Sequence, residues 1–154
     1  MKRHFRRRSN RLKQQTLRGS KSIWKQLRLP SGGSLLITDM AKGFDYQVID
    51  RLAQFSGLEK RKVAEFANIS PSTLIRRAGQ GKFNAEESDR LWRMARLFEL
   101  ATELFEGDDQ AAQEWINEPA HGLDGRAPIE MIGTSLEFET VSTLIERLEH
   151  GVVA

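Results

Sequence analysis

The 154-residue sequence contains no cysteine, which excludes disulfide bonds and cysteine-ligated zinc clusters. Its three histidines, His4, His121 and His150, lie too far apart to form a recognisable metal-ligand spacing. The sequence also lacks a histidine, a serine and an acid at a recurring catalytic spacing, and it has no glycine loop typical of phosphate binding. We therefore expect no metal, no cofactor and no enzymatic activity.

Long apolar runs are missing as well. The longest aliphatic run, Leu35–Ile37, is far too short to cross a bilayer, and no apolar segment follows the basic N-terminal residues as a secretory signal requires. No stretch has the sustained alternation of apolar and polar residues that is typical of strands. These absences predict an all-α protein of the cytoplasm that does not associate with membranes.

The net charge of +3 conceals a division along the chain. Residues 1–28 contain eleven Lys or Arg and no acid, whereas residues 97–154 contain thirteen acidic residues against Arg126 and Arg147, a net charge of −11. A basic end favours the phosphate backbone of a nucleic acid, and an acidic end favours a protein partner or a cationic pocket. We therefore expect the two ends to bind different partners.

Residues 1–42 are interpreted as a basic flexible arm and linker. The apolar residues from Met1 to Leu29 are too scattered to bury much surface on their own, and Pro30–Ser34 has the glycine and serine content of a linker. Two functions remain open for the arm. One is contact with DNA, and the other, because the segment is basic and free of acids, is that of a mitochondrial-type targeting peptide.

The segment Arg61–Ala78 has the pattern of two short helices joined by a tight turn. Asn68 tolerates the left-handed backbone that reverses a helix sharply, and Ala64 is small enough for the two helices to cross closely. Ser70 and Pro71 suit the N-cap and the first position of the second helix. The segment predicts a helix-turn-helix, the alternative being an ordinary helical hairpin with a solvated basic face.

The second helix of this pair is expected to face DNA. If Leu74 docks the helix, the hydroxyl and guanidinium groups of Ser72, Thr73, Arg76 and Arg77 point outward. Such groups suit phosphates and guanine edges in a major groove. The predicted contacts with operator DNA are Lys60, Lys62, Ser70, Ser72, Thr73, Arg76, Arg77 and Lys82, and the protein would be associated with the nucleoid when bound.

A long helix is predicted to follow. Asn84 and Glu87 have the spacing of a capping box, and the apolar pattern continues to about Glu106. The apolar residues cover more than one stripe, which is typical of a central core helix or of a dimer interface. A single helix-turn-helix usually needs a second copy to reach a paired half-site, so we expect both roles, and a homodimer. The predicted dimerisation residues are Trp92, Leu97, Leu100 and Leu104.

Two further helices are predicted near the C-terminus. Asp108 caps a short helix, Thr134 and Glu137 have the spacing of a capping box for the last helix, and Gly151 suits its end. We therefore divide the chain into the arm and linker of residues 1–42, a DNA-binding and dimerisation domain of residues 43–106, and a small helical domain of residues 107–154.

The C-terminal third carries a specific resemblance. The segments WINEPAHGLDGRAPIEMI and VSTLIERLEHGVVA resemble the toxin-binding domain of Xre/MbcA/ParS-type antitoxins, with Trp115, Pro119, Gly125, Pro128 and Gly151 in the order of the family pattern. Upstream, TLIRR and ESDRLWRMARLFELA resemble the DNA-binding half of that family. The resemblance spans about residues 43–154. The chain departs from the pattern at several positions, among them Asp124, where a glycine is usual.

The resemblance implies an Xre/Cro-like helix-turn-helix domain followed by a small helical toxin-binding domain. In this family the usual partner is a RES-domain toxin that destroys NAD. The C-terminal domain covers the active site of the toxin, and the N-terminal domain represses the operon. The family therefore implies a type II antitoxin that binds a cognate RES-domain toxin and operator DNA.

A pocket that holds the two phosphates of NAD is expected to be basic, so Glu146, Glu149 and the terminal carboxylate would complement it, with His150–Val153 as a short plug. Glu146 and Glu149 could instead be only the solvated face of a helix, and Arg126 and Glu130 could be rim contacts or an internal salt bridge. The toxin-binding residues implied are Trp115, Arg126, Glu130, Glu146, Glu149, His150, Gly151, Val152, Val153 and Ala154.

A one-component helix-turn-helix transcriptional regulator with a C-terminal ligand-sensing domain is the alternative function. Purification together with the product of the neighbouring gene distinguishes the two hypotheses, because only an antitoxin is expected to form a tight stoichiometric protein complex.

Overall fold

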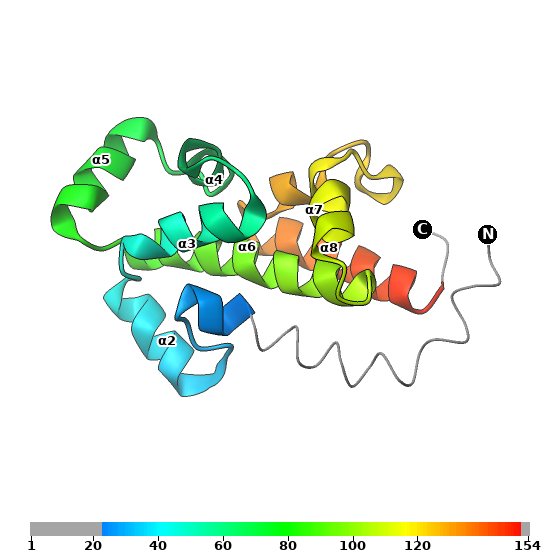
Figure 1. Ribbon diagram of the computed structural model, residues 1–154, viewed down its shortest axis with the longest axis horizontal. Helices are drawn as coiled ribbons and strands as arrows, with labels where there is room; N and C mark the ends of the chain where they lie inside the picture. The colour runs from blue at the N-terminus through cyan, green and yellow to red at the C-terminus, as the bar shows by residue number, and fades with distance from the viewer. Residues whose placement is uncertain (1–22, 152–154) are drawn as a thin grey trace.

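The computed structural model describes residues 23–151, and this part of the chain is helical, without a strand (Figure 1). The helices are α2 (Gly33–Lys42), α3 (Gln47–Ser56), α4 (Lys60–Phe66), α5 (Pro71–Gln80), α6 (Ala85–Leu104), α7 (Asp109–Asn117) and α8 (Ser135–Glu149), with short 3-10 helices at His121–Leu123 and Pro128–Met131. The expected all-α fold is confirmed. No helix of the described range is long and apolar enough to span a membrane.

Helix α6 is the central element of the molecule. The predicted capping box fixes its start, since Asn84 Oδ1 accepts the backbone N–H of Glu87 at 2.8 Å and Glu87 Oε1 accepts that of Asn84 at 2.9 Å. The helix contacts α2 and α3 as well as α7 and α8 (Figure 1). Its broad apolar distribution follows from this central position, because several neighbours cover it. The buried side chains between Ile23 and Ile145 form one continuous core, to which the helices before α6 and those after it both contribute.

The expectation of a flexible arm and linker is wrong for residues 23–27 and 33–42, which are helical, and only the short connection at residues 28–32 is a loop. Residues 23–27 form a helical turn in which Ile23, Trp24 and Leu27 are buried, and α2 follows almost directly. The indole of Trp24 stacks on Trp92 with ring centroids 6.1 Å apart, and its Nε1–H donates to Glu99 Oε1 at 2.9 Å. The three apolar residues are too few to make a core alone, but they complete the core around α6. Residues 1–22, the rest of the predicted arm, lie outside the described residues.

The predicted dimerisation residues are largely used within one chain. Leu97 is fully buried within one chain, so the prediction that it lies in a dimer interface is wrong. Trp92 lies between Trp24 and Phe138, whose ring centroid is 6.4 Å away, and Leu100 and Leu104 are partly buried against the core. The apolar surface that predicted an interface therefore mostly reflects the central position of α6.

The loop before α3 packs closely against the loop that connects α5 to α6. This contact fixes the position of the connection between the two helices. Gly43 has φ 87°, and a Cβ there would lie 1.9 Å from the carbonyl oxygen of Phe83, so only glycine fits. The backbone of Phe83 donates to the carbonyl of Phe44 at 2.9 Å, and the backbone N–H of Phe44 donates to the buried Oγ of Ser88 at 2.8 Å. The C-terminal end of α5 is thereby attached to the core.

Candidate functional site

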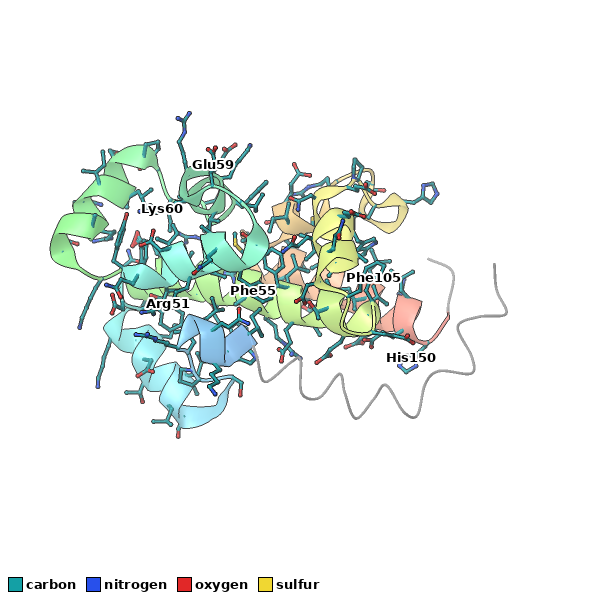
Figure 2. The ribbon with its side chains drawn as sticks, viewed as in Figure 1. Arg51, Phe55, Glu59, Lys60, Phe105 and His150 are labelled. Atoms are coloured by element: carbon teal, nitrogen blue, oxygen red, sulfur yellow. The ribbon has the colours of Figure 1, made fainter. Side chains whose placement is uncertain are left out.

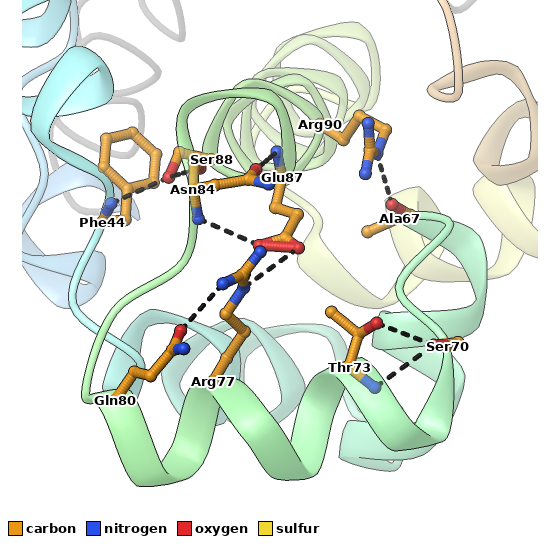
Figure 3. A network of polar contacts seen from close by, with 10 residues as sticks. All are labelled: Phe44, Ala67, Ser70, Thr73, Arg77, Gln80, Asn84, Glu87, Ser88 and Arg90. Atoms are coloured by element: carbon orange, nitrogen blue, oxygen red, sulfur yellow. Dashed lines mark hydrogen bonds and ion pairs between the residues drawn. The ribbon is translucent and has the colours of Figure 1, made fainter.

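The turn between α4 and α5 has the geometry expected of a helix-turn-helix. Asn68 adopts a left-handed backbone with φ 54°, and the N–H of Ile69 reaches back to the carbonyl of Ala64 at 2.8 Å. Ala64 and Ala67 are buried at the crossing of the two helices. Arg90 of α6 donates through Nε to the carbonyl of Ala67 at 2.6 Å, which anchors the turn to the central helix (Figure 3).

The start of α5 is also as predicted. Ser70 is its N-cap and accepts the backbone N–H of Thr73 through Oγ at 3.2 Å, with Pro71 in the first turn (Figure 3). The Oγ of Ser70 also lies 2.9 Å from Oγ1 of Thr73, so both hydroxyls are engaged in holding the helix start. Ser70 and Thr73 are therefore better explained as structural groups of the turn than as free side chains.

The outer face of α5 is open to solvent. None of its residues is buried, and Leu74 is partly buried against the core, as expected for the docking residue. Ser72 and Arg76 are exposed on the opposite side, and Arg76 makes no hydrogen bond or ion pair with any other described residue. The guanidinium of Arg76 is therefore free to bind a ligand.

The prediction that Arg77 faces outward is wrong. Its Nε lies 2.7 Å from Oε1 of Glu87, its Nη1 donates to Gln80 at 2.8 Å, and the side chains of Arg77 and Glu87 are 16% and 5% exposed (Figure 3). Arg77 follows the docked Leu74 by three residues, so both lie on the inward face of the helix. This helical spacing was the signal that could have identified the inward orientation. The ion pair fixes the rotation of α5 on α6.

The lysines predicted to contact DNA differ in whether they form an ion pair with another residue of the chain. Lys60 Nζ lies 2.9 Å from Oδ1 of Asp50, and this hydrogen bond raises the lysine pKa above its ordinary value (Figure 2). Lys62 forms an exposed pair with Glu65 at 3.3 Å, which solvent screens. Lys82 is exposed beside the end of α5. Of the three lysines, Lys82 is therefore the one that forms no ion pair with another described residue.

Helix α7 attaches the C-terminal part of the chain to the helix-turn-helix. Asp108 caps it by accepting the N–H of Ala111 at 3.0 Å, as predicted, and Gln113 Nε2 donates to the carbonyl of Phe55 in α3 at 2.9 Å. Trp115, expected in the toxin interface, is partly buried with its ring centroid 6.2 Å from that of Phe105. The Trp115 ring therefore packs mainly within the C-terminal part of the chain.

The loop that precedes α8 is held by internal contacts. Arg126 forms an ion pair with Glu137 at 2.7 Å and donates to the carbonyl of Glu130 at 3.1 Å, whereas the Glu130 carboxylate accepts the N–H of Ala127 at 2.7 Å. Rim contacts and an internal salt bridge were the two alternatives for Arg126 and Glu130. In the structure Arg126 forms an internal salt bridge, but its acidic partner is Glu137. Asp124 adopts φ 53°, which explains why glycine is usual at this position.

The ion pair in this loop predicts a pH dependence of stability. The hydrogen bond from Arg126 lowers the pKa of the Glu137 carboxyl below its ordinary value. A carboxylate with a lowered folded-state pKa contributes stability above the unfolded pKa and loses it as the pH falls through the folded pKa. Because Arg126 is 48% and Glu137 27% exposed, the contribution at pH 7 is expected to be below about 1 kcal/mol.

Urea unfolding of the wild type and of Glu137→Gln at pH 7 and at pH 3 measures this contribution. The variant should be less stable at pH 7, and the difference should shrink at pH 3. Glu139→Gln, on the same helix and exposed, is the matched control and should change stability little at either pH. A difference for Glu137→Gln that is equal at both pH values would contradict the assignment.

The end of α8 is exposed, as predicted. Glu146 and Glu149 lie in solvent, His150 caps the helix, and Gly151 adopts φ 71° directly after it (Figure 2). The last buried side chains of the helix are Leu144 and Ile145. Val152, Val153 and Ala154, the rest of the predicted plug, lie outside the described residues. The end of α8 and the helix α5 lie at opposite ends of the molecule (Figure 1).

The sequence patterns of two known domain types match this chain. Residues 36–96 match the antitoxin Xre-like helix-turn-helix domain, which covers the segment from α2 into α6. Residues 100–151 match the antitoxin Xre/MbcA/ParS C-terminal toxin-binding domain. The helix-turn-helix and the C-terminal module described above therefore correspond to the two halves of one known arrangement.

Two curated relatives extend the match over most of the chain. An antitoxin Xre of Yersinia enterocolitica is 34% identical over 135 residues, which cover 86% of this chain and 91% of the relative. An antitoxin Xre of Photorhabdus laumondii subsp. laumondii is 33% identical over 137 residues, which cover 88% of this chain and 93% of the relative. On the strength of these matches and of the two domains in this order, the chain belongs to the Xre antitoxin family.

Proposed function

We propose that this protein is the antitoxin of a type II toxin–antitoxin module. Its C-terminal end enters the active site of a RES-type NAD-degrading toxin, and helix α5 binds operator DNA and so represses the operon of the protein. The observation that carries the proposal is the exposed acidic end of α8, which lies at the opposite end of the molecule from α5, the helix that carries Arg76 (Figure 1). An acidic surface is repelled by DNA, so the two ends suit different partners. The toxin and the operator can then be bound at the same time.

The charge of the C-terminal end suits the pocket of an NAD-degrading enzyme. Such a pocket binds two phosphates and therefore carries positive charge, which the exposed carboxylates of Glu146 and Glu149 would complement. Gly151 ends the helix in a left-handed conformation, which lets the chain beyond it leave the helix direction. The segment from His150 to the C-terminus would then reach the pocket as a plug.

Co-expression with the product of the neighbouring gene tests the proposal. We expect a stoichiometric complex, and we expect the neighbouring protein alone to arrest growth and lower cellular NAD. Arrest without a fall in NAD would retain an antitoxin but exclude a RES-type partner. If no complex forms and growth is unaffected, the one-component regulator becomes the better hypothesis.

The DNA-binding part of the proposal rests on Arg76. Arg76→Ala should weaken binding to the promoter region of its own gene by about 1–3 kcal/mol if the guanidinium contacts a base edge. Gel-shift titrations with promoter DNA and with a scrambled duplex measure the effect. Arg147→Ala, an exposed arginine on α8, is the matched control and should bind both duplexes as the wild type does. Unchanged affinity of Arg76→Ala for both duplexes would remove Arg76 from the interface.

The proposed DNA-binding surface consists of Ser72, Arg76 and Lys82, with Lys62 at its edge, and Arg77 serves to orient the helix. A homodimer remains part of the proposal, because paired half-sites need two copies of α5. The stoichiometry of the protein on promoter DNA, measured by analytical ultracentrifugation, tests this.

A further inference from the structure

Ile75 is exposed on the helix that is proposed to face DNA. Its exposed fraction of 75% is the highest among the large apolar side chains in the described part of the chain. A free surface isoleucine needs no explanation by itself, but this one lies in the middle of the outer face of α5, next to Arg76 and one turn after Ser72. The position is therefore one where an apolar side chain would meet whatever the helix binds.

The outward direction of Ile75 is fixed by contacts on the opposite side of α5. Leu74 is packed against the core, and Arg77 is held by Glu87 at 2.7 Å, with both side chains of the pair largely buried (Figure 3). Turning Ile75 inward would require this pair to break, which leaves the buried Glu87 carboxylate without its cation. A β-branched side chain also has essentially one rotamer in a helix. Ile75 is therefore held rigidly at the surface.

The surroundings of Ile75 suit a nucleic acid better than a protein. Its neighbours on the outer face are the hydroxyl of Ser72 and the free guanidinium of Arg76. One turn later comes Gly79, where an added Cβ would meet nothing within 4 Å, so a partner can approach the backbone closely. A hydroxyl and a guanidinium are groups that a helix in a major groove uses for phosphates and base edges, and an apolar side chain beside them can contact a thymine methyl.

The apolar group that a base pair displays in the major groove is the C5-methyl of thymine. We infer that Ile75 is a specificity-determining residue that packs against a thymine methyl of the operator, beside the contact made by Arg76. The inference rests on the proposed DNA-binding function and adds to it the kind of base that one position of the site must contain. Removal of the methyl alone should therefore weaken binding at one thymine of each half-site.

Replacement of thymine by deoxyuridine tests this inference, because it removes the methyl group and leaves every hydrogen-bonding atom of the base in place. The probe is a duplex from the promoter of this gene, shortened to the region that the protein protects from cleavage, with each thymine replaced in turn. The wild type should lose about fourfold in affinity at the contacted thymine, the value expected for one methyl group removed from an apolar contact.

Variants of Ile75 assign that loss to its side chain. Ile75→Ala should bind the thymine duplex more weakly and should bind the thymine and deoxyuridine duplexes equally, whereas Ile75→Val, which keeps the branch at Cβ and loses only the terminal methyl group, should retain part of the preference. Leu136→Ala, which changes an equally exposed side chain on α8, is the matched control and should keep the full preference. Helical circular dichroism of Ile75→Ala should match the wild type, since no core contact is removed.

The possible outcomes distinguish failure of the role of Ile75 from failure of the proposed DNA-binding function. If the wild type does not bind the promoter duplex, both the proposed repression and the role of Ile75 are overturned. If it binds but no single deoxyuridine weakens binding, or if Ile75→Ala keeps the full thymine preference, only the role of Ile75 is overturned. A variant that loses self-association with an unchanged thymine preference would place Ile75 in a protein interface and equally overturn the inference.

Discussion

Deletion of residues 2–29 is expected to unfold the protein, whereas deletion of residues 2–22 keeps every buried residue described above. The longer deletion removes Ile23, Trp24 and Leu27, all buried around α6, and the hydrogen bond from Trp24 to Glu99. Loss of a buried tryptophan costs about 3–5 kcal/mol and loss of a buried leucine about 2–5 kcal/mol. Together these amounts approach the whole stability of a typical domain, about 5–15 kcal/mol.

Thermal unfolding followed by circular dichroism, together with binding of a hydrophobic dye, compares the two deletions. Residues 2–22 contain nine Lys or Arg, so the shorter deletion already removes most of the N-terminal charge and controls for its loss. The point variant Trp24→Ala should lie between the wild type and the longer deletion. A cooperative transition of the longer deletion within a few degrees of the wild type would show that the segment is not part of the core.

Removal of residues 150–154 should abolish or sharply weaken toxin neutralisation while the fold is retained. The deletion starts after Glu149, and the last buried residues of α8 are Leu144 and Ile145, so no buried side chain of α8 is lost. Among the described residues it removes only the exposed C-terminal turn, where the N–H of His150 bonds to the carbonyl of Glu146. DNA binding should also persist, since α5 lies at the other end of the molecule (Figure 1).

Growth of cells that express the partner toxin with the full-length or truncated chain measures this effect, and a pull-down separates lost binding from lost blockage. A full-length variant that carries Glu146→Gln and Glu149→Gln is the matched control for charge, because it keeps the plug and removes the two carboxylates. Full protection by a stably folded truncated chain would move the inhibitory surface to the loop at Arg126 or to the face of α8 that bears Glu146.

The helix-turn-helix could be predicted because its signals are local. The left-handed turn at Asn68, the N-cap at Ser70 and the capping box of Asn84 with Glu87 each depend on residues no more than three positions apart. Such groups satisfy the free backbone N–H groups at a helix start whatever the rest of the chain does. Their residue types and spacing therefore sufficed to place the starts of α5 and α6.

The packing of these elements could not be predicted in the same way. Trp24 binds Glu99, which lies 75 positions later in the sequence, and periodicity carries no information on such a partner. The apolar residues of the N-terminal segment looked too few because the surface they cover belongs to another helix. Arg77 is a different case, since its spacing of three residues from Leu74 already indicated the inward face, and only its partner, Glu87, ten positions later and beyond a loop, could not be predicted.

The position of α6 also limits how members of this family can recombine. The two matched domains meet between residues 96 and 100, within a continuous helix and not in a linker. Gly133 is also close to the helix-turn-helix turn, since a Cβ there would lie 2.9 Å from the side-chain amide nitrogen of Asn68 and that side chain would have to shift. A chimaera that takes its DNA-binding half from one relative and its C-terminal half from another must therefore carry matching faces of α6. New pairings of operator and partner are consequently expected to arise by substitutions on α5 and at the end of α8, and not by exchange of whole halves.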